Sequence, residues 1–155
     1  MSALQIRAAA PDPAHPHAKP FESIDADIDA AVALDDPAAA ATRLLALAEE
    51  VLERWILGRG ETPTAERREH FRLIALHHQG TRNAPSFNAC RETCREIAYH
   101  YNLLCGEPRD ARRAQRQRMM GLLVRHLALF VSGKMEVEKL GEFCCASRPL
   151  RIADC

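Results

Sequence analysis

Residues 119–131 read Met-Met-Gly-Leu-Leu-Val-Arg-His-Leu-Ala-Leu-Phe-Val, and only Arg125 and His126 interrupt this run with charged or titratable side chains. Pro108 precedes the segment, as proline commonly does near the start of a helix. A helix that is apolar on nearly every side is buried on several sides. We therefore predict a central helix over residues 108–132 that other helices surround.

The rest of the chain carries the signals of further helices. Asp36-Pro37 and Thr62-Pro63 each place a capping side chain directly before a proline, which is favoured in the first helical turn. Apolar residues then recur at intervals of three and four, which is the spacing of one helix face. The predicted helices cover residues 23–32, 36–57, 62–80, 86–106, 108–132 and 135–143.

Short connections between long helices favour antiparallel neighbours, and the small number of glycine and β-branched residues argues against a sheet. We therefore predict an all-α protein, an antiparallel bundle of four long helices with a short helix near each end. A chain of 155 residues can bury one core. The predicted bundle forms a single domain over 21–143, with a flexible proline-rich arm over 1–20 and a cysteine-containing tail over 144–155.

Charge is distributed unevenly along the chain. There are 21 basic and 21 acidic side chains and no net charge, so no overall field attracts nucleic acid or a membrane surface. Residues 1–58 nevertheless carry a net charge of −6, and residues 59–133 carry one of +6. We expect the two halves to complement each other within the fold or between copies. The alternative is an exposed basic surface that binds an anion.

Three arginines stand at the start of the predicted central helix. Arg112, Arg113 and Arg116 continue the sector of the helix that later holds its core residues. Cations are unfavourable at a helix N-terminus, so we expect either a bound phosphate or an acidic segment to offset them. Few aromatic residues are available to stack on bases, so nucleic acid is not the expected partner. The acidic candidates are Asp25, Asp27, Asp29, Asp35 and Asp36.

Cys90 and Cys94 are four residues apart and therefore share one face of a predicted helix. Their neighbours on that face are apolar, and a buried free cysteine acts as a small hydrophobic residue, which is the favoured interpretation. The alternative is a transition-metal site, although the spacing fits neither a structural zinc site nor a di-iron bundle. We predict no specific cofactor. The candidate metal ligands are His70, His77, His100, Cys90 and Cys94.

A polar loop follows the third predicted helix. Such loops between buried helices often line functional sites, and histidine, arginine and asparagine side chains suit a small anion. A cysteine near a helix N-terminus, such as Cys90, is also a candidate nucleophile if a histidine reaches it. No catalytic residue is assigned. The candidate anion-binding residues are His77, His78, Arg82, Asn83, Arg112, Arg113 and Arg116.

Three further cysteines, Cys144, Cys145 and Cys155, lie in the predicted tail. Adjacent cysteines do not readily form a disulfide with each other. The favoured interpretation is that these residues are inert, and the alternatives are pairing with Cys155, as in a thiol switch, or binding of a soft metal. The N-terminal residues lack the apolar run of a secretion signal, and no stretch reaches the ~18 apolar residues of a membrane span. We therefore expect a cytoplasmic protein in which the six cysteines are thiols or metal ligands.

Three classes of function are compatible with these features. The favoured one is a regulatory or accessory helical protein, rather than an enzyme, that contacts a protein partner or a second copy of itself. The second is a sensor or carrier based on a Cys/His metal site or on thiols. The third is a small enzyme or anion-binding protein with its site at the loop between His77 and Cys90. An exposed apolar patch would support the first class, and a pocket lined by His, Arg and Asn would support the third.

Overall fold

The structure is a computed structural model that describes residues 21–140. Within these residues the chain is all-helical, as predicted, with no strand and one isolated β-bridge between Arg68 and Phe71. The predicted arm over 1–20 and tail over 144–155 lie outside the described residues. The elements are α1 (Phe21–Val32), α2 (Pro37–Gly58), α3 (Arg72–Gly80), the 3-10 helix η1 (Pro85–Cys90), α4 (Arg91–Gly106) and α5 (Arg113–Val137).

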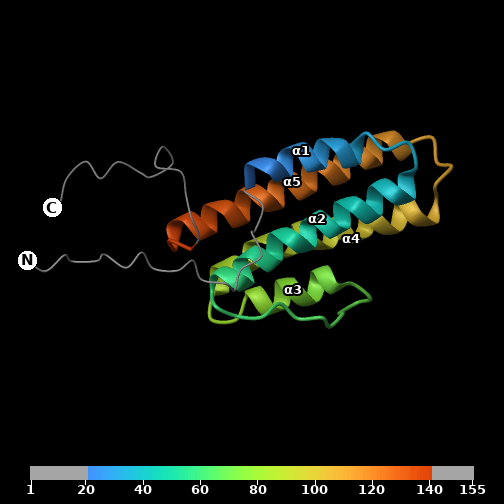
Figure 1. Cartoon of the computed structure of the whole chain (residues 1–155). Helices are drawn as coiled ribbons and strands as arrows, with labels where there is room; N and C mark the ends of the chain where they lie inside the picture. Colours follow the sequence, from blue (N-terminus) through green and yellow to red (C-terminus); the bar gives the residue numbers. More distant parts are fainter. Residues whose placement is uncertain (1–20, 141–155) are drawn as a thin grey trace, which may run out of the picture.

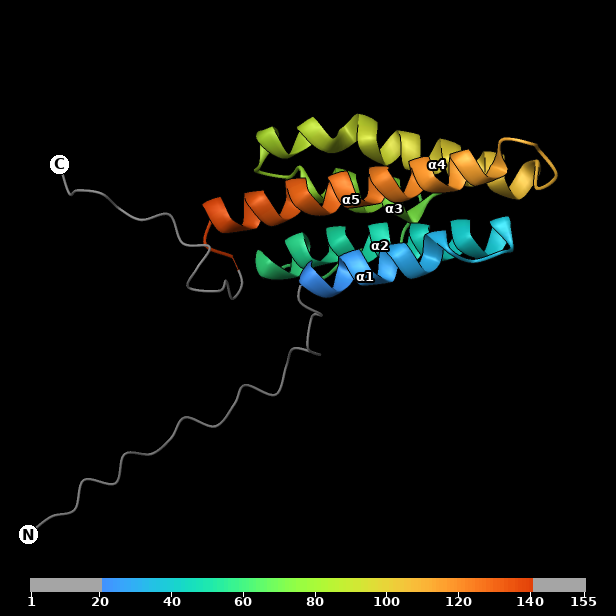
Figure 2. The same ribbon diagram turned by 90° about the horizontal axis from the view of Figure 1, so that it is seen from above.

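Four of the helices lie side by side, and α3 lies outside them. Figures 1 and 2 show α1, α2, α4 and α5 running in alternate directions along a common axis. α5 contacts α1, α2 and α4, whereas α3 packs on α2 and α4. In Figure 1, α3 and the chain that leads to it form a separate layer below α2 and α4. Of the helices described, none combines the length and the hydrophobicity that a bilayer span requires.

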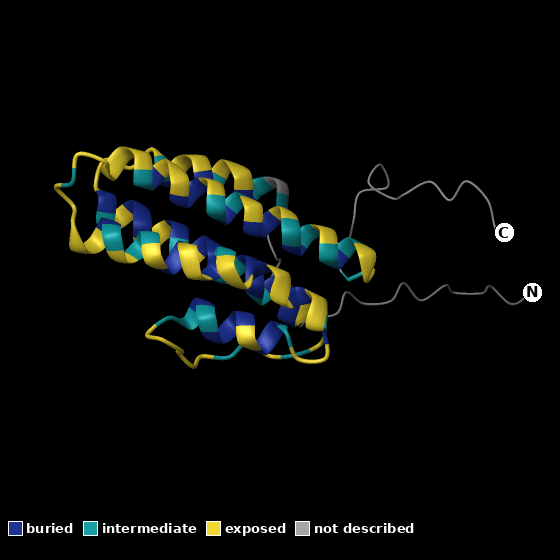
Figure 3. Cartoon of the chain, turned by 180° about the vertical axis from the view of Figure 1, so that it is seen from behind, coloured by how far each residue is buried: buried dark blue, intermediate teal, exposed yellow. Residues whose placement is uncertain are grey.

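Mostly aliphatic side chains fill the space between the helices. On α2 the apolar series predicted by helical spacing, Leu44, Ala48, Val51 and Trp55, is fully buried. Figure 3 shows the buried residues turned toward the neighbouring helices and the exposed ones turned outward. Full burial of one large aliphatic side chain contributes about 1.5–3 kcal/mol, so this packing holds α2 in place more than local helix propensity does.

The apolar central helix is not surrounded as predicted. Val124 and Leu127 of α5 are fully buried, but Met119, Leu122 and Leu129 are 42%, 55% and 68% exposed. The reason is that α1, α2 and α4 cover only part of the circumference of α5. One apolar stripe of this helix therefore faces outward from the described part of the chain.

The third predicted helix is shorter than expected and begins at Arg72 instead of Thr62. The buried side chain of Gln79 donates a hydrogen bond to the carbonyl oxygen of Thr62, and its own oxygen accepts one from the backbone N–H of Thr64, both at 2.8 Å. These bonds satisfy backbone groups that a helix would otherwise pair. Residues 61–68 therefore lie alongside α3 and are not part of this helix.

The predicted break at Gly133 is wrong, because α5 continues through it to Val137. Val131 and Met135 are buried on either side of the glycine. Their packing outweighs the cost of a glycine inside a helix, which is about 1 kcal/mol. Residues 141–143, the last part of the short helix predicted here, lie outside the described residues.

The acidic segment pairs with arginines other than those predicted. Asp25 and Asp29 of α1 accept hydrogen bonds from Arg125 of α5 at 3.0 and 2.8 Å. Asp27 lies 4.0 Å from Arg43 of α2. The two Arg125 bonds join the acidic and basic halves of the chain within the fold, whereas the Asp27–Arg43 pair lies within the acidic half. None of these arginines is one of the predicted partners.

The predicted core-facing position of the arginine cluster is also wrong. Arg112 and Arg113 are exposed, and Arg116 lies 3.2 Å from each of two carboxylates of the α4–α5 turn. The inward sector at this end of α5 is occupied by Gln117, whose Nε2 donates to two carbonyl oxygens at the end of α1 and beyond it. The carboxylates that pair with Arg116 are therefore close to it in the chain. Arg112 and Arg113 lie outside the core.

Candidate anion-binding site

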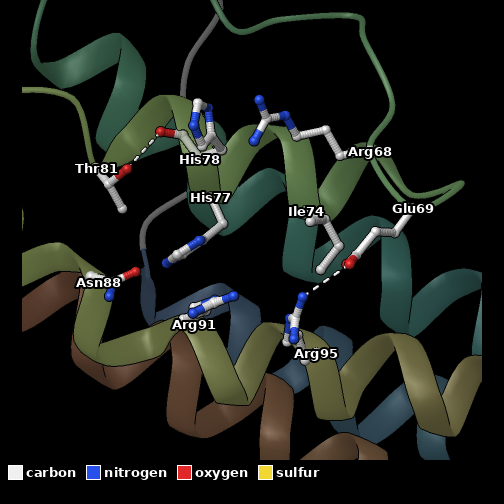
Figure 4. A pocket seen from close by; sticks show the side chains of 9 residues that line it. All are labelled: Arg68, Glu69, Ile74, His77, His78, Thr81, Asn88, Arg91 and Arg95. Atoms are coloured by element: carbon white, nitrogen blue, oxygen red, sulfur yellow. Dashed lines mark hydrogen bonds and ion pairs between the residues drawn. The ribbon is translucent and has the colours of Figure 1, made fainter.

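A pocket of about 460 Å³ opens between α3, the start of α4 and the turn that precedes α3. Figure 4 shows its side chains approaching from these elements and from η1. Small-molecule sites commonly have volumes of about 300–1,000 Å³, so the pocket is large enough for a small ligand. Its lining residues are Arg68, Glu69, Ile74, His77, His78, Thr81, Asn88, Arg91 and Arg95.

Positive charge dominates this lining. Arg68 comes from the turn, and Arg91 and Arg95 come from successive turns of α4. Glu69 is the one carboxylate, and its Oε1 accepts a hydrogen bond from Nη2 of Arg95 at 2.9 Å. Among residues 21–140, neither Arg68 nor Arg91 forms an ion pair with a carboxylate. Two guanidinium groups at the pocket therefore lack a counter-charge from the described chain.

His77 enters the pocket wall from α3. The residue is 6% exposed, and its Nε2 atom is buried without a hydrogen-bond partner in the described part of the chain. In Figure 4 its ring extends from α3 toward Asn88 and Arg91. An unpaired buried polar group costs about 1–3 kcal/mol. A ligand that pairs with this atom would recover that free energy.

An aromatic stack fixes the distance between α3 and η1. Nε1 of Trp55 donates to the carbonyl oxygen of Gly80 at 2.9 Å, and the Trp55 ring stacks on Phe87 with centroids 4.6 Å apart. The centroid of the His77 ring lies 6.0 Å from the centroid of the Phe87 ring. A Cβ atom at Gly80 would lie 2.8 Å from Phe87 and 3.0 Å from Trp55. Only glycine permits this close approach, which sets the wall of the pocket.

Arg68 and Glu69 are presented by a tight turn. Arg68 and Phe71 exchange two backbone hydrogen bonds of 3.0 and 2.9 Å, and the residues between them, Glu69 and His70, have φ angles of 52° and 71°. Two successive positive φ angles are typical of a type I′ turn, a conformation that costs a non-glycine residue roughly 1–2 kcal/mol. The ion pair between Glu69 and Arg95 connects this strained turn to α4.

His78 stands at the exposed edge of the pocket. Desolvation and, after it, the positive charges of Arg68 and Arg82 lower the pKa of His78 below its ordinary value. The lower pKa favours the neutral form of the imidazole at pH 7. An anion bound among these cations would raise the pKa of His78 and favour uptake of a proton.

Cys90 and Cys94 lie behind the pocket, 2% and 0% exposed, as their shared helix face predicts. A hydrogen bond from the Cys94 thiol and the nearby imidazole of His77 lower the pKa of Cys90 to about 6, against the opposing effect of burial. The same hydrogen bond and burial raise the pKa of Cys94. The Cys90 thiol donates a hydrogen bond to the carbonyl oxygen of Phe87 at 3.2 Å, so the burial and bonding of the two cysteines agree with their interpretation as small hydrophobic residues.

Only part of the predicted anion-binding set lines the pocket. His77 and His78 belong to it. Arg82 and Asn83 lie in the exposed loop after α3, where the carbonyl oxygen of Arg82 accepts a hydrogen bond from Arg59 at 3.0 Å. The remaining three candidates follow the C-terminal end of α4, whereas the pocket lies at the N-terminal end of this helix: Arg112, Arg113 and Arg116.

The predicted metal ligands are not brought together as a site. Among the described residues, no group of three or more His, Cys, Asp or Glu side chains could hold a metal ion. His70 is exposed in the turn before α3, and Nδ1 of His100 lies 2.9 Å from the carbonyl oxygen of Glu96. The other three candidates, His77, Cys90 and Cys94, are neighbours. The thiol candidates Cys144, Cys145 and Cys155 lie outside the described residues.

Most of the residues that make the pocket basic were not among the site residues predicted from the sequence. Arg91 and Arg95 follow Cys90 and Cys94 at the same spacing of four, and this repeated pattern is the signal that the sequence offers. Arg68 offers no such signal. Its position depends on the turn before α3, and the prediction of a continuous helix over residues 62–80 did not include this turn.

Comparison with known proteins found no matching family, no similar curated protein and no similar solved structure. The interpretation of this site therefore rests on its geometry and charge.

Proposed function

We propose that the protein binds a small ligand with an oxyanion group, such as a phosphate, in the pocket between α3 and α4. The observation that carries this proposal is the pair of guanidinium groups, Arg68 and Arg91, that line the pocket without a carboxylate partner among the described residues. The planar guanidinium group matches the oxygens of a phosphate or carboxylate and binds them with charge-assisted hydrogen bonds.

Neutral polar groups around the arginines support the same ligand class. The side-chain amide of Asn88 can donate to such a ligand, and the unpaired Nε2 of His77 is a further polar atom of the pocket wall. Arg91 is also the first residue of α4, and the N-terminus of a helix favours negative charge. Ile74 is the one aliphatic residue of the lining, so the favoured ligand is predominantly polar.

The proposed activity is binding, and no catalytic step is assigned. Cys90 is absent from the lining of the pocket, so a nucleophilic attack on a bound ligand has no support. Ligand binding by a regulatory or accessory protein, or by a carrier, agrees with this arrangement.

Isothermal titration calorimetry with inorganic phosphate at low ionic strength tests the proposal. Arg91→Gln should weaken binding at least about tenfold, since charged hydrogen bonds contribute about 1.5–3 kcal/mol each. The matched control is Arg118→Gln, because Arg118 is also an exposed helical arginine but lies on α5 away from the pocket. Equal effects of the two variants, or no binding of phosphate, sulfate or citrate by the unmodified protein, would reject the proposal.

A second candidate function, self-association, is favoured by the exposed apolar stripe of α5. Met119, Leu122 and Leu129 belong to it, and their exposure is large for apolar residues. The stripe is nearly symmetric about the exposed His126, with leucines four residues before and three after it and with Met119 and Gly133 each seven residues away. Such spacing is complementary to itself in an antiparallel pair, as a two-fold interface requires.

Sedimentation equilibrium over a range of concentrations tests the pairing of two copies. Leu129→Glu should produce a monomer under conditions in which the unmodified chain is a dimer. Leu34→Glu is the control, because Leu34 is 42% exposed but lies beyond the end of α1 and not on α5. A monomeric unmodified protein at all concentrations would remove this candidate and leave the proposal of ligand binding unaffected.

A further inference from the structure

We infer that the ligand of the pocket is a phosphorylated carboxylic acid, whose phosphate group binds at Arg91 and whose carboxylate binds at Arg68. This inference deepens the proposed function and rests on it, because it requires that the pocket binds an oxyanion. It adds that the ligand has a second acidic group, which a carbon chain joins to the first.

The volume of the pocket exceeds what a single oxyanion fills. The pocket measures about 460 Å³, whereas a water molecule takes about 30 Å³ in the liquid and a phosphate group only a small multiple of that volume. Sites of about 300–1,000 Å³ typically bury most of an organic ligand. Charged groups of the lining that a small anion does not reach would keep no counter-charge. The size of the pocket therefore favours a ligand that extends from one cation to another.

Two adjacent histidines of α3 mark two separate polar regions of the pocket. Successive residues of a helix point about 100° apart. His77 is buried, and in Figure 4 its ring extends toward Asn88 and Arg91. His78 is exposed, and in the same view the side chain of Arg68 extends along α3 toward it, on the other side of this helix from Arg91. The two arginines therefore approach a ligand from different sides.

The region around Arg91 suits the more highly charged end of the ligand. Arg91 is the first residue of α4, where the helix dipole favours an anion. Asn88 lines the pocket, and the buried Nε2 of His77 in its wall has no hydrogen-bond partner among the described residues. A phosphate group has three strong acceptor oxygens, so it can pair with several of these polar groups at once. We therefore place the phosphate in this region.

The region around Arg68 suits a carboxylate. Two backbone hydrogen bonds to Phe71 fix the backbone of Arg68 in its turn, while its guanidinium group forms no ion pair with a carboxylate of residues 21–140. The neighbouring Glu69 is already paired with Arg95 at 2.9 Å. A planar carboxylate matches a guanidinium group through two parallel hydrogen bonds. The carboxylate of the ligand would thus supply the counter-charge that Arg68 lacks.

Two phosphonates of equal chain length test the inference by isothermal titration calorimetry at low ionic strength. Phosphonopropionate ends in a carboxylate, and propylphosphonate ends in a methyl group at the same position. The unmodified protein should bind phosphonopropionate about tenfold more tightly or better, which is the factor expected for one charged hydrogen-bonded pair. Arg68→Gln should remove most of this preference and leave the affinity for propylphosphonate nearly unchanged. Arg91→Gln should weaken the binding of both phosphonates.

Arg67→Gln is the matched control, because Arg67 is exposed and adjacent in the chain but absent from the lining of the pocket. It removes the same charge and should retain the preference for phosphonopropionate. Equal affinities of the unmodified protein for the two phosphonates would overturn the inference, and this comparison needs no variant. A preference that Arg68→Gln keeps, or that Arg67→Gln loses equally, would also overturn it.

Inorganic phosphate, titrated in the same buffer, separates failure of the inference from failure of the proposed function. Binding of phosphate together with equal binding of the two phosphonates, or with binding of neither, overturns the second acidic group alone. Absence of binding for all three compounds rejects the oxyanion site as well.

Discussion

Nη2 of Arg95 donates a hydrogen bond to Oε1 of Glu69 at 2.9 Å, across a separation of 26 residues in the chain. The pair connects α4 to a turn whose two central residues have positive φ angles. It also neutralises one of the three arginines of the pocket. One contact thus affects both the shape and the charge of the proposed anion site, and several testable consequences depend on it and on the neighbouring packing.

Replacement of Glu69 should strengthen anion binding. Glu69→Gln removes the one negative charge of the lining and frees Arg95 to contact the ligand. A charge at ~4 Å contributes about 1 kcal/mol in water, so the affinity for phosphate should rise about fivefold. Calorimetry at low salt measures the change. Glu107→Gln is the control, because Glu107 also pairs with an arginine but lies at the other end of α4. Weaker binding by Glu69→Gln would mean that the turn, and not the charge, governs the site.

Three glycine-to-alanine changes should alter the free energy of unfolding in different directions. A Cβ at Gly80 would meet Phe87 at 2.8 Å, and one at Gly121 would meet Val32 at 2.5 Å, whereas one at Gly133 meets nothing within 4 Å. Gly80→Ala and Gly121→Ala should lower the free energy of unfolding by about 1–3 kcal/mol. Gly133→Ala should raise it by about 0.5–1 kcal/mol, because alanine favours a helix interior. Urea unfolding measures all three, and a stabilised Gly80→Ala protein would contradict the described packing of Trp55 and Phe87.

His70→Gly should stabilise the fold. His70 has a φ angle of 71°, and Glu69 before it has one of 52°. Each residue therefore adopts the left-handed conformation, which is unfavourable for a residue other than glycine. Glycine adopts this conformation without that cost, and the free energy of unfolding should rise by up to about 1 kcal/mol. Thermal unfolding with and without phosphate checks the result. Retained phosphate affinity would show that the imidazole of His70 takes no part in the site.

The stability of the protein should depend on the ionisation of Cys90. Its pKa is about 6 in the folded protein and about 8.5 in an unfolded chain. Between these values the unfolded state binds more protons, so stability should rise with pH from about 6 to 8.5 and lose this contribution below pH 6. The change should be on the order of 1–3 kcal/mol. Urea unfolding at pH 5.5, 7 and 8.5 measures it, and Cys90→Ser should flatten the slope relative to the unmodified protein. Parallel slopes in the two proteins would mean that Cys90 stays protonated.

Much of the helical framework could be predicted from local sequence. Asp36 accepts a hydrogen bond from the backbone N–H of Ala39 and caps α2, as its position before Pro37 predicts. The apolar series on α2 and the shared face of Cys90 and Cys94 are buried, as their spacing predicts. Caps and periodic apolar residues act within a few residues of the chain, so they can be read without knowledge of the fold.

The site could be predicted only in part. His77 and His78 were found because they adjoin a polar loop, but Arg68 and Glu69 were placed on a helix that does not form there. The bonds from Gln79 to residues 62 and 64 are long-range side-chain interactions, and no local pattern indicates that a glutamine will satisfy backbone groups 15–17 residues away. Those bonds hold the non-helical segment before α3 against this helix, and Arg68 at the end of that segment lines the pocket.

Sequence alone determined that α2 and α4 are helical and which of their faces are apolar, because helix caps and apolar periodicity act between near neighbours in the chain. The tertiary structure alone decided that α5 keeps an exposed apolar stripe, that Arg125 and not Arg116 meets the acidic residues of α1, and that three arginines surround one pocket. The physical reason is that burial and ion pairing depend on which helices become neighbours. That choice is made by the packing of the whole chain.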